Sequence, residues 1–275
     1  SLPFHLTRYF RPTFLESMSL TNTEIGDIFA VYGITAALAY LPGGVIADRF
    51  NPKLLMGTSL ILTGLGGVAL LCNPTITDLK MLYGFWGITT ILLFWCPLIK
   101  LTRLWGGAQS QGIAFGLLDG GRGIVAAICA SIGVMILHFV NNKGFFIFGE
   151  LNRSIDAIIA CYVILTITSG FLILTFLTYP KIDGNSIEKR RSYTVLINKK
   201  LWLHAAIIVS SYSAYKCLDY YSLFMFEVYR WSEEASAGFS ATVSFLRPLS
   251  AFAAGLLSDR IGSSSSLKYL FLILV

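Results

Sequence analysis

Residues 28–47 read IFAVYGITAALAYLPGGVIA, a run of 20 residues without charge that lies between Asp27 and Asp48. At a rise of about 1.5 Å per residue, a helix of this length crosses the hydrocarbon core of a bilayer. Only a structure that closes all of its backbone hydrogen bonds survives in lipid, so the run predicts a spanning helix rather than a strand. Four further runs of 19 to 24 uncharged residues occupy 54–77, 81–99, 123–142 and 157–180.

Two less uniform runs follow, at about 201–228 and 234–258, and both contain charged residues. Residues 1–17 predict a further helix that starts partway, and residues 269–275 are apolar but too short to cross. We expect eight spans in whole or in part, with a ninth cut short. The predicted fold class is an all-α, polytopic membrane protein.

The composition supports a membrane protein. Of the 275 residues, 55% are hydrophobic and 13% are charged, whereas a soluble domain has about 25% charged residues. This leaves too little polar surface for a cytosolic enzyme, a nucleic-acid-binding protein or a disordered chain. The formal charge of +6 is spread between the apolar runs, so it does not indicate a nucleic-acid partner.

Cysteine and histidine give no sign of a metal site, a cofactor or an enzyme. The 5 cysteines lie inside apolar runs without a CxxC pair, which predicts free thiols. His5, His138 and His204 are isolated from one another along the chain, and no cluster of His, Asp and Glu has catalytic spacing. We therefore expect no cofactor, no metal and no catalytic residue, and a monomer in the lipid bilayer.

Loop charge sets the expected orientation. With the 48–53 loop inside, the inner loops hold twelve Lys and Arg residues and the outer loops hold four, as the positive-inside rule requires. The longest polar stretch, 181–200, then lies inside. It separates a first half of six helices, 1–180, from the start of a second half, 201–275. The expected location is the cytoplasmic (inner) membrane of a bacterium.

A short motif occurs twice in the chain. Gly44-Val-Ile-Ala-Asp48-Arg49-Phe-Asn51 follows the second predicted span, and Gly255-Leu-Leu-Ser-Asp259-Arg260-Ile-Gly262 follows the eighth, 211 positions later. Both copies lie at the inner end of the second helix of a half. Six-helix halves related by a parallel repeat are a known transporter architecture.

The two copies resemble the signature of the major facilitator superfamily, which has Gly, then Asp four residues later, then Arg and a further basic residue. The resemblance implies two halves that rock around a central site, with the motif residues keeping the inner gate shut. The alternative is plain topology, in which the basic residues only mark the inner side. The candidate gating residues are Gly44, Asp48, Arg49, Lys53, Asp259 and Arg260.

Ionisable residues within the spans carry a surplus of positive charge. Placing such a side chain at the centre of a bilayer costs roughly 2.5–3.5 kcal/mol on insertion scales, so each is expected to have a partner or a function. Two unbalanced cations in a low-dielectric cavity repel each other, which predicts an anionic substrate that neutralises them. The five cations are Arg8, Arg11, Arg122, Lys216 and Arg247, and the three acids are Asp119, Asp219 and Glu227.

Arg8 and Lys216 lie on the first helix of each half, 208 positions apart, which is within one helical turn of the repeat offset. They are the first candidates for substrate binding. Arg122 is a reserve candidate, and Tyr212 and Tyr215 are candidate partners because they lie on helical faces near Lys216 or Asp219.

Internal pairing is the alternative for some of these charges. Lys216 and Asp219, like Asp119 and Arg122, have the i,i+3 spacing of a helical ion pair. Asp119 and Asp219 are also possible proton-coupling residues. Their cationic neighbours favour the ionised form, which supports exchange over proton symport.

Parts of the chain resemble the organophosphate–phosphate antiporter branch of that superfamily. These parts are Leu6-Thr7-Arg8, Thr23-Glu24-Ile-Gly26 and the segment from Ala47 to Lys53. The resemblance implies a phosphoryl-binding Arg on helix 1, matched by Arg8. It also implies a basic residue on helix 7, matched by Lys216 with a shift of about two positions.

The same branch has a W-P-P-x-x-R run on helix 4, and Trp95-Cys96-Pro97-Leu98-Ile99-Lys100 is similar to it with Lys100 in place of Arg. Arg122 stands where the branch has a substrate-site His. These departures leave sulfonated and carboxylated sugars and nitrate-like anions as alternatives to phosphate.

Together the patterns predict a secondary transporter for a small organic or sugar-derived anion, which could be a sugar phosphate, a sulfonate or a carboxylate. Antiporter and symporter mechanisms both stay open. One alternative is a facilitator for a neutral or cationic solute whose charges are internally paired. Another is a transporter-like sensor that binds a ligand and signals to a partner.

Overall fold

The computed structural model describes residues 2–107, 109–143, 155–179, 198–217, 224–225, 228–231 and 233–274. Within these ranges every regular element is a helix, as the apolar runs predict. The chain forms two compact units, the first made of residues 1–111 and 128–179 and the second of residues 112–127 and 180–275. The predicted boundary at 181–200 lies largely outside the described residues.

The chain begins with three short helices instead of the single helix expected over residues 1–17. They are η1 (Pro3–His5), α1 (Leu6–Tyr9) and α2 (Arg11–Ser17). The break lies at Phe10, whose backbone has φ −121° and ψ 39°. Pro12 lacks an N–H group, so it cannot continue the hydrogen-bond ladder from α1 but fits the first turn of a new helix.

Five described helices are long and apolar enough to cross a membrane, and they confirm the five uncharged runs. They are Asn22–Arg49, Pro52–Cys72, Ile76–Gly106, Gln111–Ile136 and Asp156–Phe176. In element terms these are α3 (Asn22–Arg49), α4 (Pro52–Val68) with η2 (Ala69–Cys72), α5 (Ile76–Ile88) with η3 (Thr89–Trp95) and α6 (Cys96–Gly106), the greater part of α7 (Gln111–Lys143), and α8 (Asp156–Phe176).

Capping residues start α3 and α5 five to six residues before the uncharged runs begin. The Thr21 hydroxyl accepts the Glu24 N–H at 3.2 Å, and the Glu24 carboxylate accepts the Thr21 N–H at 2.7 Å. Thr75 and Asp78 form the same reciprocal box at the start of α5. Each box satisfies backbone N–H groups that would otherwise lack a partner at a helix N-terminus.

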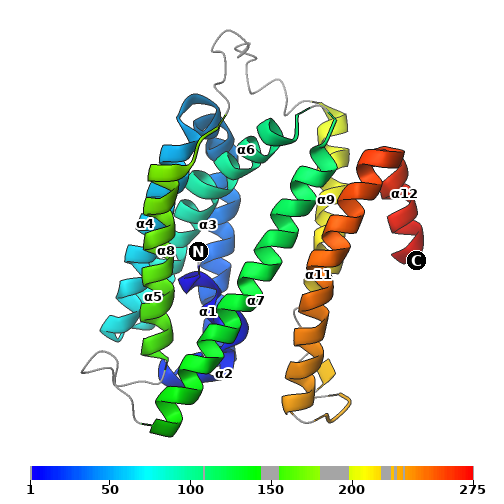
Figure 1. The fold of residues 1–275 in the computed structure, drawn as a ribbon. Helices are drawn as coiled ribbons and strands as arrows, with labels where there is room; N and C mark the ends of the chain where they lie inside the picture. The colour runs from blue at the N-terminus through cyan, green and yellow to red at the C-terminus, as the bar shows by residue number, and fades with distance from the viewer. Residues whose placement is uncertain are drawn as a thin grey trace. The chain divides into compact units, whose positions relative to one another are not determined.

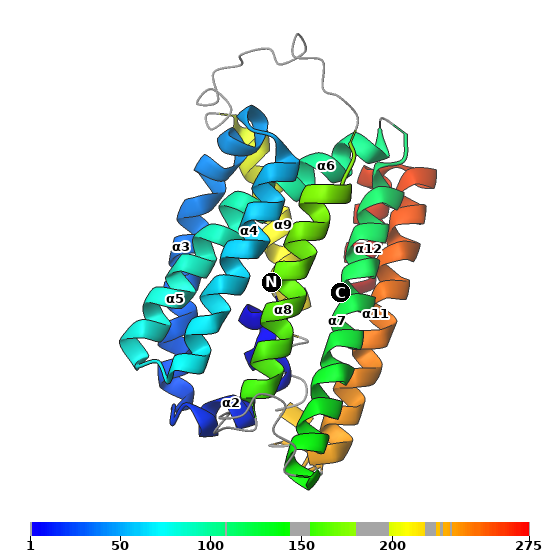
Figure 2. The same cartoon turned by 60° about the vertical axis from the view of Figure 1, so that its left-hand side comes forward.

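In the first unit α4 packs along α8 and α3 packs along α5 (Figures 1 and 2). Glycine permits the close approach of α3 and α5, since a side chain at Gly87 would meet the Tyr32 carbonyl oxygen at 2.9 Å and the Ala36 nitrogen at 3.0 Å. The apolar core gathers where α3, α5 and α8 begin. Its largest fully buried members include Phe14, Ile25, Ile28, Leu79, Tyr83, Trp86, Ile158 and Tyr162.

The second unit contains the first half of α7, with α9 (Lys199–Cys217), α11 (Glu233–Ile261) and α12 (Ser263–Leu274). Gly262, at φ +85°, joins α11 to α12 in a left-handed conformation that favours glycine. The α7 backbone lies close to α11, because a side chain at Gly120 would meet the Pro248 carbonyl oxygen at 3.3 Å and one at Gly116 would meet that of Ala251 at 3.1 Å. Figures 1 and 2 both show these two helices side by side.

We predict that Gly87→Ala lowers the unfolding free energy by about 1–3 kcal/mol, since the added methyl group overpacks the α3–α5 contact. Gly33→Ala is the matched control in α3. No described atom lies within 4 Å of a side chain built there, and alanine favours the helix by about 0.5–1 kcal/mol. Thermal unfolding of the purified protein in detergent, followed by size-exclusion chromatography, measures both. Equal midpoints for the two variants would contradict the close approach.

Candidate functional site at the inner helix ends

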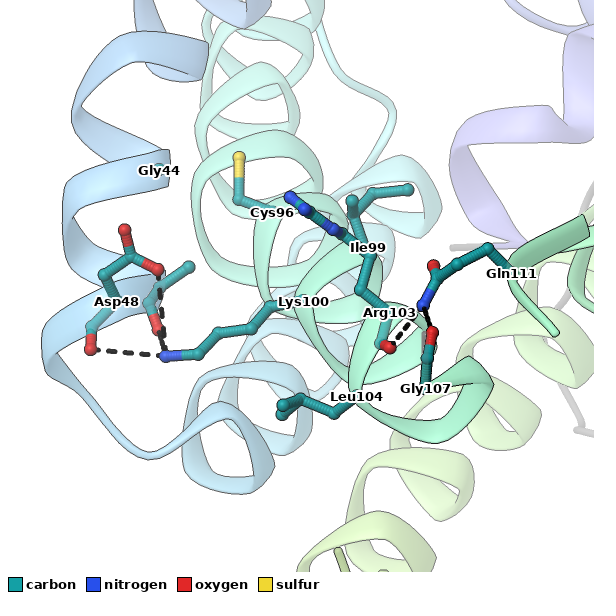
Figure 3. A pocket seen from close by; sticks show the side chains of 10 residues that line it. Gly44, Asp48, Cys96, Ile99, Lys100, Arg103, Leu104, Gly107 and Gln111 are labelled. Carbon is teal, nitrogen blue, oxygen red and sulfur yellow. Dashed lines mark hydrogen bonds and ion pairs between the residues drawn. The ribbon is translucent and has the colours of Figure 1, made fainter. Parts of the chain in front are cut away.

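A pocket of about 660 Å³ lies in the first unit between the ends of α3 and α6 and the start of α7 (Figure 3). This end of the unit is the predicted inner end, because it carries the first copy of the repeated motif. Two motif residues, Gly44 and Asp48, line the pocket. The full lining is Gly44, Ala47, Asp48, Cys96, Ile99, Lys100, Arg103, Leu104, Gly107 and Gln111.

Lys100 links α6 to the C-terminus of α3. Its Nζ donates to the carbonyl oxygens of Ala47 at 2.7 Å and Asp48 at 3.2 Å, and it lies 3.8 Å from Asp48 Oδ1. These carbonyls are among the last four of the helix and have no partner within it, and a cation there also complements the helix dipole. The Lys100 side chain is 19% exposed and that of Asp48 is 73% exposed, so the ion pair is open to solvent on the Asp48 side. Figure 3 shows Lys100 reaching across to the end of α3.

Two other side chains satisfy helix C-termini at the same end. The Gln111 amide donates to the carbonyl oxygen of Arg103 at 2.8 Å and to that of Gly107, which closes the turn from α6 into α7 (Figure 3). Lys53 Nζ donates to the carbonyl oxygen of Thr175 at 3.2 Å, at the end of α8. The candidate gating residue Lys53 therefore holds a helix end, whereas Arg49 is exposed.

Asp259, from the second copy of the motif, holds a helix N-terminus within the second unit. Its Oδ1 accepts the Gly112 N–H at 2.7 Å and its Oδ2 accepts the Ile113 N–H at 2.7 Å, so both carboxylate oxygens bind the first turn of α7. Two short, charge-assisted bonds to a helix N-terminus are a strong arrangement. Arg260 beside it is exposed.

The glycines of the two copies have different surroundings. Gly255 lies against the Gly112 carbonyl group, and a side chain there would meet Gly116 Cα at 3.3 Å. At Gly44 no described atom lies within 4 Å of the position that a side chain would take. The sequence pattern is the same, but of the two motif glycines only Gly255 lies in close contact with a second helix within the described residues.

The structure describes the predicted substrate residues only in part. Arg8 lies in α1, and Lys216 and Tyr215 lie in α9, but their side chains are outside the described part of the molecule. Asp219 is outside it altogether. Tyr212 is 57% exposed on α9.

Arg122 and Asp119 form the ion pair that their spacing allows. Arg122 Nη1 lies 2.9 Å from Asp119 Oδ1, and both side chains are partly exposed on α7. The reserve substrate residue and one candidate coupling residue thus neutralise each other in this conformation.

Sequence reasoning did not select Lys100 or Gln111 as site residues, although both lie in segments that it quoted. A basic residue near the inner end of a span looks like a topological marker, because the sequence does not say which carbonyl it reaches. The sequence did contain one signal for Lys100. It lies about one turn after Pro97, close to the inner end of its span, and α3 also ends at the inner side.

Comparison with known proteins gives a family and distant relatives. A sequence profile of the Major Facilitator Superfamily matches residues 4–275. The inner membrane protein YqcE of Escherichia coli (strain K12) is 29% identical over 232 residues, which are 80% of this chain and 52% of YqcE. No solved structure matches the chain at a significant level.

Two more distant relatives have names that state a substrate. The "Probable hexose phosphate transport protein" of Chlamydia muridarum (strain MoPn / Nigg) is 23% identical over 147 residues, 51% of this chain and 32% of that protein. The "Probable sulfoacetate transporter SauU" of Cupriavidus necator is 28% identical over 137 residues, 44% of this chain and 30% of that protein. The chain spans 48% to 61% of the length of the relatives that match most of it.

We predict that Asp259→Ala destabilises the protein by about 1–2 kcal/mol, because two N–H groups of α7 lose their acceptor. Asp259→Asn keeps one acceptor and should fall between the parent and Asp259→Ala. Asp48→Ala is the matched control in the first motif copy, and we expect a change of about 0.5 kcal/mol or less for its exposed ion pair. Thermal unfolding midpoints measure all three, and an equal loss in Asp48→Ala and Asp259→Ala would contradict the assignment.

Proposed function

Because this chain belongs to the Major Facilitator Superfamily, we propose that the protein is a secondary transporter that moves a small organic or sugar-derived anion by alternating access. It is an integral membrane protein with at least five described helices long enough to span. The proposal rests on one observation above all, the surplus of positive charge inside the predicted spans. An enzyme is not supported, since the family and the named relatives point to transport.

The charge surplus favours an anion because buried cations need a counterion. Asp119 already neutralises Arg122 at 2.9 Å, and Arg11 donates to the Asn22 side chain at 2.9 Å rather than to an acid. Arg8 and Lys216 are the proposed substrate contacts, with Tyr212 and Tyr215 beside Lys216 on the same helix. A travelling anion would supply the charge that the spans lack.

The names of two relatives support an oxyanion in particular. One is named for hexose phosphate and the other for sulfoacetate. A phosphate ester and a sulfonate both present tetrahedral oxyanion groups, which guanidinium and ammonium groups bind by charge-assisted hydrogen bonds. The proposed location is the cytoplasmic membrane of a bacterium, in line with the name of the relative YqcE and with the inner basic loops.

We further propose that the motif residues form an inner gate. The Asp259 contacts with Gly112 and Ile113 join the end of a second-half helix to the start of a first-half helix, in the halves predicted from the sequence. A rocking motion that opens the inner end must break them. On the first copy, Lys100 and Asp48 would restrain the end of α3, with Gly44, Arg49, Lys53 and Arg260 completing the gating set.

Exchange is the proposed coupling mode. The Asp119 carboxylate is already paired with the Arg122 guanidinium at 2.9 Å, so its negative charge is balanced within α7. Asp219 is the other candidate for coupling and lies outside the described residues. Substrate that leaves on one side and counter-anion that enters from the other would neutralise the same cations in turn.

We predict that Arg8→Gln and Lys216→Gln each raise the KM for the transported anion by about 10- to 100-fold, the effect of removing one charge-assisted hydrogen bond. Uptake into proteoliposomes that hold the full-length protein measures this, with glucose 6-phosphate, sulfoacetate and inorganic phosphate as candidate solutes. Lys80→Gln is the matched control, because Lys80 pairs with Asp27 at 3.2 Å on exposed side chains. Unchanged KM in the Arg8 and Lys216 variants would defeat the substrate assignment.

Two outcomes of the same assay would replace the proposed function. Uptake of neutral or cationic solutes only, with both variants active, would indicate a facilitator whose charges are internally paired. Saturable binding of an anion without flux would indicate a sensor.

We predict that anion counterflow continues when a protonophore collapses the proton gradient, because exchange needs no proton. Asp119→Asn should keep counterflow within about threefold of the parent, since the ion pair with Arg122 is partly exposed. Uptake that requires an inward proton gradient, and that is abolished in Asp119→Asn, would establish symport instead.

A further inference from the structure

The helix over residues 76–106 changes its winding in the middle. Between α5 and α6 it forms a π-helix, η3, over Thr89–Trp95, and the Cys96 N–H donates to the Ile91 carbonyl oxygen, a step of five residues. A π turn holds one more residue than an α turn and leaves a backbone carbonyl without its usual partner. In a span such a carbonyl needs a donor from elsewhere.

Hydroxyl groups of α4 donate to the first residue of the π segment, and the Thr90 hydroxyl donates to the Trp86 carbonyl oxygen just before it at 2.6 Å. Ser59 Oγ donates to the Thr89 carbonyl oxygen at 2.6 Å, and Thr63 Oγ1 donates to Thr89 Oγ1 at 3.0 Å. Trp86 Nε1 donates in turn to the Thr63 carbonyl oxygen at 3.0 Å. Ser59, Thr63 and Thr89 are 1%, 0% and 2% exposed, so these bonds form away from water and lipid headgroups.

Helix α3 also contacts the π segment. The Tyr32 hydroxyl lies 3.3 Å from Thr90 Oγ1. At Gly43 the backbone of α3 comes so close that a side chain there would meet Cys96 Sγ at 2.8 Å and Leu92 Cα at 3.0 Å. The residue at the junction of η3 and α6, Cys96, therefore lies against α3.

The π segment determines which way α6 faces. If Thr89–Trp95 were wound as an ordinary α-helix with the same number of residues, α6 would turn by about 100° around its axis, the rotation of one residue. Cys96 would then leave Gly43. Lys100, one turn further on, would leave the carbonyl groups of Ala47 and Asp48 that it now reaches at 2.7 and 3.2 Å.

We propose that Ser59 and Thr63 are positioning residues that stabilise the π form of Thr89–Trp95 and thereby set the rotation of α6 that brings Lys100 to the end of α3. The inner-end pocket is formed by residues that depend on this rotation, among them Cys96, Ile99, Lys100 and Arg103. The inference goes beyond the proposed transport of an anion, because it holds for whichever solute the protein carries.

Cys96 reports the rotation directly. In the full-length protein with Cys72, Cys129, Cys161 and Cys217 replaced by alanine, the rate of Cys96 labelling by a membrane-permeant maleimide measures its shielding by α3. We expect labelling to rise about fivefold for each hydroxyl group removed, in Ser59→Ala and in Thr63→Val, and more in the double variant. Thr63→Ser keeps the hydroxyl and should restore the parent rate.

Thr58→Val is the matched control on the same helix. Its hydroxyl donates only to carbonyl groups of α4, those of Leu54 at 2.7 Å and Leu55 at 3.1 Å, among its described contacts. Its labelling rate should equal that of the parent. Equal rates in Thr58→Val and the Ser59→Ala, Thr63→Val double variant would overturn the proposal.

A one-residue deletion tests the same idea without relying on the stability of the double variant. Deletion of Leu93 converts the π segment to a continuous α-helix and leaves α6 facing as before. We expect this variant to fold and to shield Cys96 like the parent. Adding Ser59→Ala to it should leave the rate of Cys96 labelling unchanged. Deletion of Leu62 from α4 is the control and should abolish folding, because it turns the rest of that helix by about 100°. Loss of folding in the Leu93 deletion, or a persistent effect of Ser59→Ala in it, would refute the assignment of η3 as the source of the rotation.

Discussion

Backbone groups without a partner inside a membrane are the constraint on which this structure depends. A helix satisfies its own interior but leaves donors at its start and acceptors at its end. Here charged and polar side chains fill those positions, with Asp259 on the first turn of α7 and Lys100 and Lys53 on the ends of α3 and α8. Ser59 donates to the Thr89 carbonyl oxygen inside a span, where the winding changes.

The parts of the fold that could be predicted are those that follow from the spacing of charges. Uncharged runs of 19 to 24 residues reveal spans because the thickness of the bilayer sets their length. The break at Phe10 was not predicted, although Pro12 is a local signal for a new helix start. The π segment at Thr89–Trp95 was not predicted because it lies inside apolar sequence whose hydropathy is the same in either winding. The π segment depends on contacts with a neighbouring helix, and Ser59 is 30 residues from the Thr89 carbonyl to which it donates.

The repeated motif shows the same limit for the candidate site. The pattern places Asp48 and Asp259 at equivalent helix ends, but one faces Lys100 at 3.8 Å and the other binds two N–H groups at 2.7 Å. Spacing predicts where a carboxylate lies along its own helix. It does not predict which helix end approaches it, because that depends on glycines such as Gly112 and Gly255 on two segments far apart in the sequence.

The strength of these helix-end contacts is compatible with the inner gate that we propose. A carboxylate on a helix N-terminus contributes about 1–2 kcal/mol, which favours the joined state by roughly 5- to 30-fold. In the proposed gate, a contact of that size would keep the inner end closed most of the time, and a solute with a modest preference for the other state would offset it. A hydrophobic seal with the same area would be far harder to break and reform, because every opening would expose apolar surface to water. Charged groups at helix ends would avoid that cost, since water can solvate them when the contact opens. The proposed gate thus accounts for polar residues of the inner end that lie at helix termini rather than along the packed faces.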